Sequence, residues 1–196
     1  MRDYRLASKS GPTRKIAETP TRFHVEFLPD GDALVIPRHS SETRAYIPFG
    51  YFSTDYLIGD ACLAMADATP YTFGVLTSTM HMAWMRQVCG RLESRYRYSA
   101  KLVYNNFPWP TDATDAQRAK VESCAQAVLD ARQGYLDDGA TLADLYDPLY
   151  MPAPLLKAHQ ALDRAVDRCY RGSKFNTERD RVEYLFGLYE ELISGD

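Results

Sequence analysis

The sequence contains no long apolar segment. None of the hydrophobic runs in its 196 residues approaches the roughly 20 residues that a membrane-spanning helix requires. The N-terminus, MRDYRLASKSGPTRK, is polar and basic and lacks the hydrophobic core of a signal peptide. We therefore expect a cytoplasmic protein with no membrane partner.

The sequence also lacks the residue clusters that bind metals or form disulfides. It contains no C-x-x-C pair, and its four histidines have no partner at ligand spacing. The widely spaced cysteines are Cys62, Cys89, Cys124 and Cys169. We expect them to be reduced packing residues, and we predict no metal site.

Recognisable catalytic machinery is scarce as well. No arrangement of Ser, Cys or His indicates a nucleophile with its base, so we predict no catalytic residue. Asn106-Phe107-Pro108-Trp109 is a degenerate match to the loop that holds the target amine in amino methyltransferases. Such an enzyme also needs a glycine-rich turn for its cofactor, and the 105 residues before Asn106 supply none. The motif favours a structural junction, with a small amino methyltransferase using Asn106–Trp109 as an open alternative.

The composition is that of a soluble globular protein, with 45% hydrophobic and 25% charged residues. The net charge of −3 hides an asymmetry. Residues 1–110 contain 13 Lys/Arg against 10 Asp/Glu, a net of +3, and residues 111–196 contain 10 against 16, a net of −6. Clustered basic residues of this kind attract polyanions, so the two halves are predicted to have different roles.

The basic half alternates between strand and helix patterns. Residues 23–38 resemble a hairpin around the turn residues Pro29–Asp32, and strand-like pieces continue to Phe52. From Tyr71 to Val88 apolar residues recur every three to four positions, which predicts one helix that ends in a left-handed cap at Gly90. A period of two then predicts a strand over 91–98, and a second strand over 101–104.

After Pro110 the sequence reads as helices. Thr114 or Asp115 can begin a helix that runs to Arg132, Pro154 stands at the start of a second, and Thr177 can cap a third. A short helix at Leu142–Tyr146 connects the first two. The predicted fold class is α+β, with a mixed strand and helix domain at 1–110 followed by a small all-α domain at 111–196.

The predicted strand after Gly90 has a charged face. On an extended segment Arg91, Glu93, Arg95 and Arg97 point the same way. Arg offers a bidentate fork to guanine and Glu accepts from the cytosine amine, so this face could read base edges in a DNA major groove. A solvated strand face with cross-strand ion pairs remains the alternative at this point.

Four segments together carry a family resemblance: TRAYIPFGYF, YTFGVLTSTMHMAWMRQVCGRLESRYRYSAKLVYNNFPWP, LADLYDPLYMPAPLLKAHQALDRAVDRCY and RDRVEYLFGLYEEL. They resemble the C-terminal end of MmeI-like Type IIL restriction–modification enzymes. In that family an endonuclease, an adenine-specific DNA methyltransferase, a target recognition domain and a helical domain follow one another in one chain. The resemblance covers nearly the whole sequence and is densest from Tyr71 to Pro110.

The resemblance implies that residues 1–110 are most of a target recognition domain and 111–196 the helical domain. It places base reading at Ala61, Glu93, Arg95 and Arg97. It implies double-stranded DNA and a methyltransferase domain as partners, with S-adenosylmethionine bound by that domain and no cofactor on this chain. The chain is then expected to be a specificity fragment that neither methylates nor cuts by itself.

We further expect Arg38, Arg44 and Lys101 to contact DNA phosphates because of their charge. A rival hypothesis makes the acidic helical half a protein-docking module, with the charged strand face merely solvated.

Overall fold

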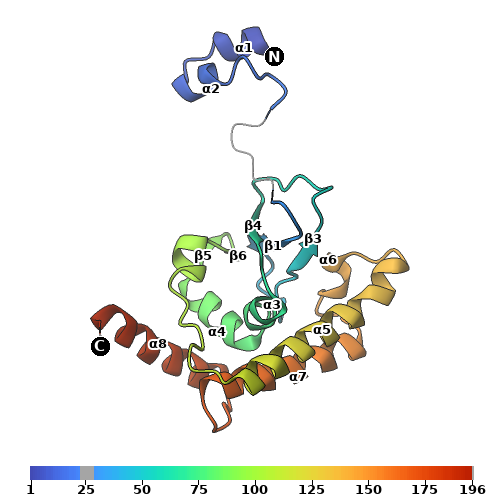
Figure 1. Ribbon diagram of the computed structural model, residues 1–196, viewed down its shortest axis with the longest axis vertical. Helices are drawn as coiled ribbons and strands as arrows, with labels where there is room; N and C mark the ends of the chain where they lie inside the picture. Colours follow the sequence, from blue (N-terminus) through green and yellow to red (C-terminus); the bar gives the residue numbers. More distant parts are fainter. Residues whose placement is uncertain (23–28, 196) are drawn as a thin grey trace.

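The computed structural model describes residues 1–22 and 29–195 (Figure 1). Two small antiparallel sheets, four short α-helices and one π-helix form the described part before Pro110, and four α-helices form the described rest, so the predicted α+β class is confirmed. The strands are β1 (Ala33–Pro37), β2 (His39–Ser40), β3 (Gly50–Phe52), β4 (Cys62–Ala66), β5 (Gly90–Leu92) and β6 (Arg95–Arg97). The helices of the main body are α3 (Pro70–Leu76), α4 (Thr79–Val88), α5 (Asp115–Asp137), α6 (Leu142–Leu145), α7 (Ala153–Tyr170) and α8 (Glu178–Ser194).

The N-terminal arm has more structure than its sequence predicts. It forms two short helices, α1 (Arg2–Leu6) and α2 (Gly11–Lys15), which pack on each other and stand apart from both sheets in Figure 1. The Arg5 guanidinium donates to the carbonyls of Ile16 and Thr19 at 2.9 and 2.7 Å. Arginine contacts of this kind, together with the Arg2–Glu18 ion pair, therefore hold the arm together.

The two sheets share one continuous stretch of chain. The first sheet has the order β3-β1-β4 and the second the order β2-β6-β5. β1 pairs with β4 and β2 pairs with β6, and Arg38 lies between β1 and β2. The predicted return strand is present as β1 and follows a bend at Asp30–Gly31, whereas the first arm of the predicted hairpin, around Phe23–Phe27, lies outside the described residues.

The long helix predicted from Tyr71 to Val88 is wrong, because the structure has two helices there. The Thr77 hydroxyl donates to the Phe73 carbonyl and the Ser78 hydroxyl to the Val75 carbonyl, both at 2.7 Å. These bonds end α3, and the Ser78 side chain then accepts from the backbone amide of His81 as the N-cap of α4. Apolar spacing continues through the break, which is why periodicity alone predicted one helix.

Two further expectations after α4 are corrected. Gly90 is not a left-handed cap: Cys89 is the C-cap in extended conformation, and the described glycines with positive φ are Gly139 and Gly195. Residues 101–104 are not a strand but part of a π-helix, η1 (Ala100–Tyr104). The Trp84 indole donates to the Val103 carbonyl at 3.0 Å, so packing against α4 shapes this segment.

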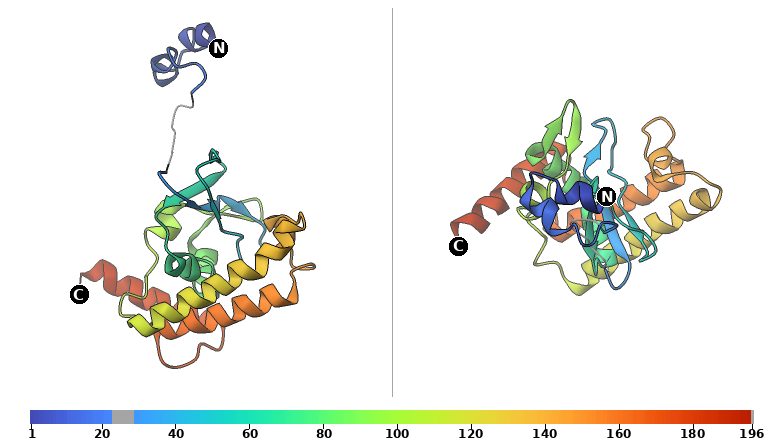
Figure 2. Two further views of the ribbon diagram at one scale, coloured as in Figure 1. Left: turned by 45° about the vertical axis from the view of Figure 1, so that its right-hand side comes forward. Right: turned by 90° about the horizontal axis from the view of Figure 1, so that it is seen from above.

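Three of the helices after Pro110 begin at threonine N-caps. Thr114, Thr141 and Thr177 each accept from the third residue of the following helix and form capping boxes that begin α5, α6 and α8. α5 and α7 run side by side beneath the sheets, and α8 packs on α4 and projects outward (Figures 1 and 2).

A single buried core crosses Pro110. Trp84 of α4 contacts the rings of Phe186 and Tyr189 on α8, and Gly74 of α3 lies against α5 and α7. The Phe107 ring packs on His81, and the Pro108 carbonyl accepts from Tyr170. The Phe-Pro-Trp-Pro stretch is thus a packed junction, while the domain boundary at 110/111 stays a prediction.

Candidate nucleic-acid interface

The charged segment after Gly90 is a hairpin and not a straight strand. β5 and β6 pair antiparallel with Leu92 opposite Arg95, and Glu93 and Ser94 form the turn. Glu93 has a φ of +57°, a left-handed conformation that an extended segment cannot contain. The prediction that four alternating side chains share one strand face is therefore wrong.

The hairpin register sorts the arginines onto two faces. Residues paired across antiparallel strands lie on the same side, so Arg95 and Arg97 share an exposed face with Leu92, while Arg91 lies on the other face with Tyr96. The Arg91 guanidinium stacks 4.3 Å from the Tyr96 ring centre and donates to the Ser94 carbonyl at 3.1 Å. Arg91 thus stabilises the hairpin from the face opposite Arg95 and Arg97.

Glu93 and Arg95 remain neighbours for a different reason than their spacing suggested. The turn brings Glu93 Oε2 to 2.9 Å from Arg95 Nη2, and the two side chains are 77% and 50% exposed. Because both side chains are exposed, both groups are accessible to a ligand. An exposed pair of this kind contributes little to stability, so opening it costs little. Arg97 is exposed and makes no side-chain hydrogen bond or ion pair within the described part of the chain.

The crossing between the sheets brings Ala61 and Arg38 to the same region. The Arg38 amide donates to the Ala61 carbonyl at 3.0 Å, and the Arg38 carbonyl accepts from Tyr98 at 2.7 Å. His39, the next residue, pairs with Arg97. Three of the predicted residues, Ala61, Arg38 and Arg97, therefore meet around one backbone crossing, although they are far apart in the sequence.

Arg44 and Lys101 do not join this group. Arg44 Nη2 donates to the Ala143 carbonyl on α6 at 3.3 Å, which directs the side chain towards the helical half. Lys101 is exposed on η1, and among the described residues no hydrogen bond or ion pair joins it to the hairpin. Their assignment as phosphate contacts stays a prediction.

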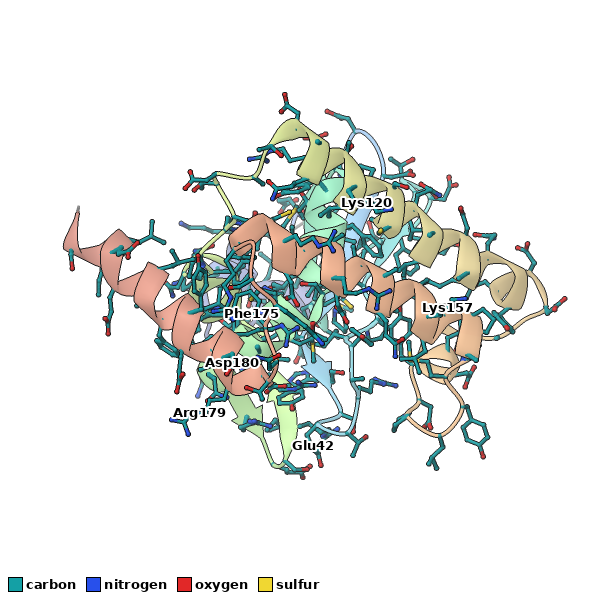
Figure 3. The ribbon with its side chains drawn as sticks, turned by 90° about the horizontal axis from the view of Figure 1, so that it is seen from below. Glu42, Lys120, Lys157, Phe175, Arg179 and Asp180 are labelled. Atoms are coloured by element: carbon teal, nitrogen blue, oxygen red, sulfur yellow. The ribbon has the colours of Figure 1, made fainter. Side chains whose placement is uncertain are left out.

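Sequence reasoning missed Glu42. It lies on the loop after β2, beside the hairpin tip, and its carbonyl accepts from the Tyr96 hydroxyl at 3.4 Å (Figure 3). Its own backbone amide, the Ser94 hydroxyl and the charges of Arg91 and Arg95 lower the pKa of Glu42. The pairing of Ser40 with Tyr96, between segments far apart in the sequence, brings this carboxylate to the hairpin, and no local sequence signal indicates that pairing.

The other candidate sites are structural within the part of the chain that is described. The Asn106 side-chain amide donates to the carbonyls of Lys101 and Leu102 at 2.8 and 3.2 Å, which fits a junction. All four cysteines are free, and no group of three potential metal ligands occurs among the described residues. No helix in these ranges is long and apolar enough to cross a membrane.

Comparisons with known proteins cover the chain in two parts. A family model of the MmeI target recognition domain matches residues 1–111, and one of the MmeI C-terminal domain matches residues 113–195. DNA methyltransferase A of Bacillus subtilis (strain 168) is 39% identical over 191 residues, which make up 97% of this chain and 21% of that protein.

The fold has a close counterpart among solved structures. The structure of the Type IIL restriction-modification enzyme MmeI in complex with DNA matches with a TM-score of 0.91 and 47% sequence identity. The match covers 98% of this chain and 25% of that chain. The chain therefore spans about a quarter of the length of that enzyme, or less for the Bacillus relative.

Proposed function

The chain belongs to the MmeI family, and from this premise we propose that it binds duplex DNA at a specific sequence on behalf of an adenine-specific DNA methyltransferase domain. The observation that carries the proposal is the match to an MmeI structure that contains DNA, at 47% identity over nearly the whole of this chain. Such a chain supplies specificity, while a domain outside these 196 residues binds S-adenosylmethionine and transfers the methyl group.

The proposed base-reading residues form one surface, which we call the reading surface: Ala61, Glu93, Arg95, Arg97 and the added Glu42. A two-stranded ribbon fits the major groove of B-DNA, and the β5–β6 hairpin is such a ribbon with an exposed charged tip. Arg95 and Arg97 can donate to guanine, and Glu93 and Glu42 can accept from the amino groups of cytosine or adenine. The Glu93–Arg95 ion pair is free to open towards bases because both side chains are exposed.

Phosphate contacts are assigned to Arg38, Arg44 and Lys101. Such contacts position a protein on DNA and carry no base preference. Arg38 is the most favourably placed, since its backbone amide bonds to Ala61 and its side chain is engaged among the described residues only through Nε, which donates to the Cys62 carbonyl at 3.4 Å and leaves the Nη groups for a phosphate.

The test is an enrichment experiment with the purified chain. A library of randomised duplexes is incubated with the protein at low salt, and the bound duplexes are sequenced over several rounds. We expect enrichment of one motif, with weak affinity because the methyltransferase domain is absent. Retention of duplexes without any motif, or no retention, would contradict the proposal and favour the protein-docking alternative.

A further inference from the structure

Arg86, in the last turn of α4, connects three segments that are far apart in sequence. Its guanidinium pairs with the Glu178 carboxylate in the first turn of α8. Its Nη2 also donates to the carbonyls of Ala45 and Arg44, at 3.3 and 3.4 Å. One side chain therefore joins the helical half to the loop that carries Glu42.

The backbone of Arg86 extends the connection to the hairpin. Its carbonyl accepts from Arg91 Nη2 at 3.5 Å, and Arg91 in turn donates to the Ser94 carbonyl and stacks on Tyr96. Arg91 thus spans from the end of α4 to the hairpin turn. The loop and the hairpin, which together form most of the reading surface, are both attached to Arg86.

Glu178 is held rigidly enough to act as the anchor. It is the first residue of α8, inside the capping box that Thr177 forms with Asp180, and α8 packs on α4. The Arg86 side chain is 22% exposed and that of Glu178 is 45% exposed. A partly buried pair that also binds two carbonyls constrains geometry more than an isolated surface pair does.

The rest of the loop is fixed from the same side. Tyr46 donates to Asp163 of α7 at 2.7 Å, and Arg132 of α5 donates to the Phe49 carbonyl at 2.6 Å. Both contacts are buried. Residues 41–45 lie between this buried clamp and the hairpin, and Arg86 contacts the end of that stretch.

We propose that Arg86, anchored by Glu178, is a positioning residue that sets the placement of Glu42 and the hairpin tip relative to each other, so that the helical half controls site selectivity without touching DNA. This inference rests on the proposed function of the reading surface. It gives α8 a role in base selection, through Glu178, in addition to its packing on α4.

The experiment compares four variants of the 196-residue chain. Glu178→Gln removes the anchoring charge, and Arg86→Gln removes the connection itself. Glu183→Gln is the matched control, because it breaks an ion pair with Arg179 on the same helix, at 2.7 Å, that is exposed on both sides (Figure 3 labels Arg179). The double variant Arg86→Gln with Glu178→Gln tests whether Glu178 acts through Arg86.

Two quantities are measured for each variant. Hydrogen–deuterium exchange follows residues 41–46 and 90–98, and fluorescence anisotropy gives the ratio of affinities for the enriched motif and a scrambled duplex. We expect faster exchange in both segments and a loss of discrimination of roughly two- to tenfold in Glu178→Gln, with wild-type values for Glu183→Gln. The double variant should be no worse than Arg86→Gln alone.

Unchanged exchange in Glu178→Gln overturns the inference, and so does faster exchange with unchanged discrimination. If the wild-type chain enriches no motif, the proposed function fails, and the positioning role for base reading falls with it. If the wild-type chain enriches a motif but the Glu178→Gln and Arg86→Gln variants discriminate as well as the wild type, the proposed function stands and this inference alone is wrong.

Discussion

Arg91, Arg95 and Arg97 show how much the surroundings of a residue decide. All three carry the same charge within seven positions, yet Arg91 is committed to Tyr96 and to two backbone carbonyls. Arg95 pairs with the exposed Glu93 carboxylate, and Arg97 makes no side-chain bond in the described ranges. A guanidinium that is already occupied by intramolecular partners cannot offer its donor fork to a base.

Reversing Glu93 and Arg95 together tests base reading. Glu93→Lys with Arg95→Asp exchanges acceptor and donor and should change the preferred base pair at one position, with about 1–3 kcal/mol of discrimination there. Each change alone should only weaken binding, because one half of the contact is left unpaired. The measurement is the motif enriched by each variant, or the sites methylated by a full-length family enzyme that carries the segment. An unchanged motif in a folded double variant would assign the charged tip to solvated scaffolding.

Two buried histidines should make the fold sensitive to acid. Burial lowers the pKa of His81 to about 3, and burial together with the Arg132 charge lowers that of His159 to about 3. In the unfolded chain both titrate near pH ~6.5, so below that pH the unfolded state binds protons that the folded state does not. The free energy of unfolding should therefore fall between pH ~6.5 and ~3, by at most about 1.4 kcal/mol per pH unit for each histidine.

His81→Gln checks this sign. Urea unfolding at pH 7.5 and 5.5 should show a decrease in stability for the wild type that is smaller by about 1 kcal/mol in the variant. Asp163 acts in the opposite direction, because burial raises its pKa, but its share is the same in both proteins. Equal pH dependence in the two proteins would show that His81 is not buried in neutral form.

At the scale of elements, the position of α3 depends on a missing side chain. A Cβ built on Gly74 would lie 2.7 Å from Val121 Cγ1 and 3.2 Å from Ala125 Cβ, both on α5. The helices can approach this closely only because residue 74 has no Cβ. α3 precedes α4 and the hairpin, so this contact also fixes where the hairpin begins.

Gly74→Ala should destabilise the protein by about 1–3 kcal/mol, since neither the α5 side chains nor the backbone can retreat without repacking. Gly187→Ala in α8 is the control, because a Cβ there meets nothing within 4 Å. That control should be neutral or more stable by about 0.5–1 kcal/mol from helix propensity. Denaturant titrations of the three proteins decide the matter, and a stabilised Gly74→Ala would mean that α3 and α5 are further apart than described.

Across the whole molecule, the basic and acidic halves of the sequence lie on different sides. The hairpin, the Arg38 crossing and the N-terminal arm belong to the half with a net charge of +3. α5 and α7 lie beneath the sheets and belong to the half with a net charge of −6 (Figure 1). Binding to DNA should therefore use the sheet side and depend strongly on salt.

Salt dependence can be assigned residue by residue. The logarithm of the association constant should fall linearly with the logarithm of salt concentration, with about 0.9 in slope for each phosphate contacted. Lys101→Gln should lower the slope by about that amount and weaken all sequences alike, whereas Lys120→Gln on α5 should not change it (Figure 3). Anisotropy titrations at several salt concentrations measure both. A salt-insensitive interaction would point to the docking alternative.

Cofactor binding is a further property of the whole chain that can be tested. We predict that the isolated chain shows no saturable binding of S-adenosylmethionine, because its sequence has no glycine-rich turn of the kind that such a cofactor requires. Calorimetry with the purified chain is the measurement. Micromolar binding would revive the alternative of a small methyltransferase built on Asn106–Trp109.

The local features of this protein follow from its sequence. Thr114 and Thr177 predicted helix starts, and Pro108 and Pro110 predicted the end of regular structure, because caps and prolines act on their immediate neighbours. Only the tertiary structure decided that residues 90–97 fold back on themselves, that Arg91 faces away, and that Glu42, Ala61 and Arg38 lie beside the hairpin. Period-two alternation continues through a two-residue turn without any change in pattern. The contacts that form the reading surface depend on strand pairing between distant segments, and no local pattern specifies that pairing.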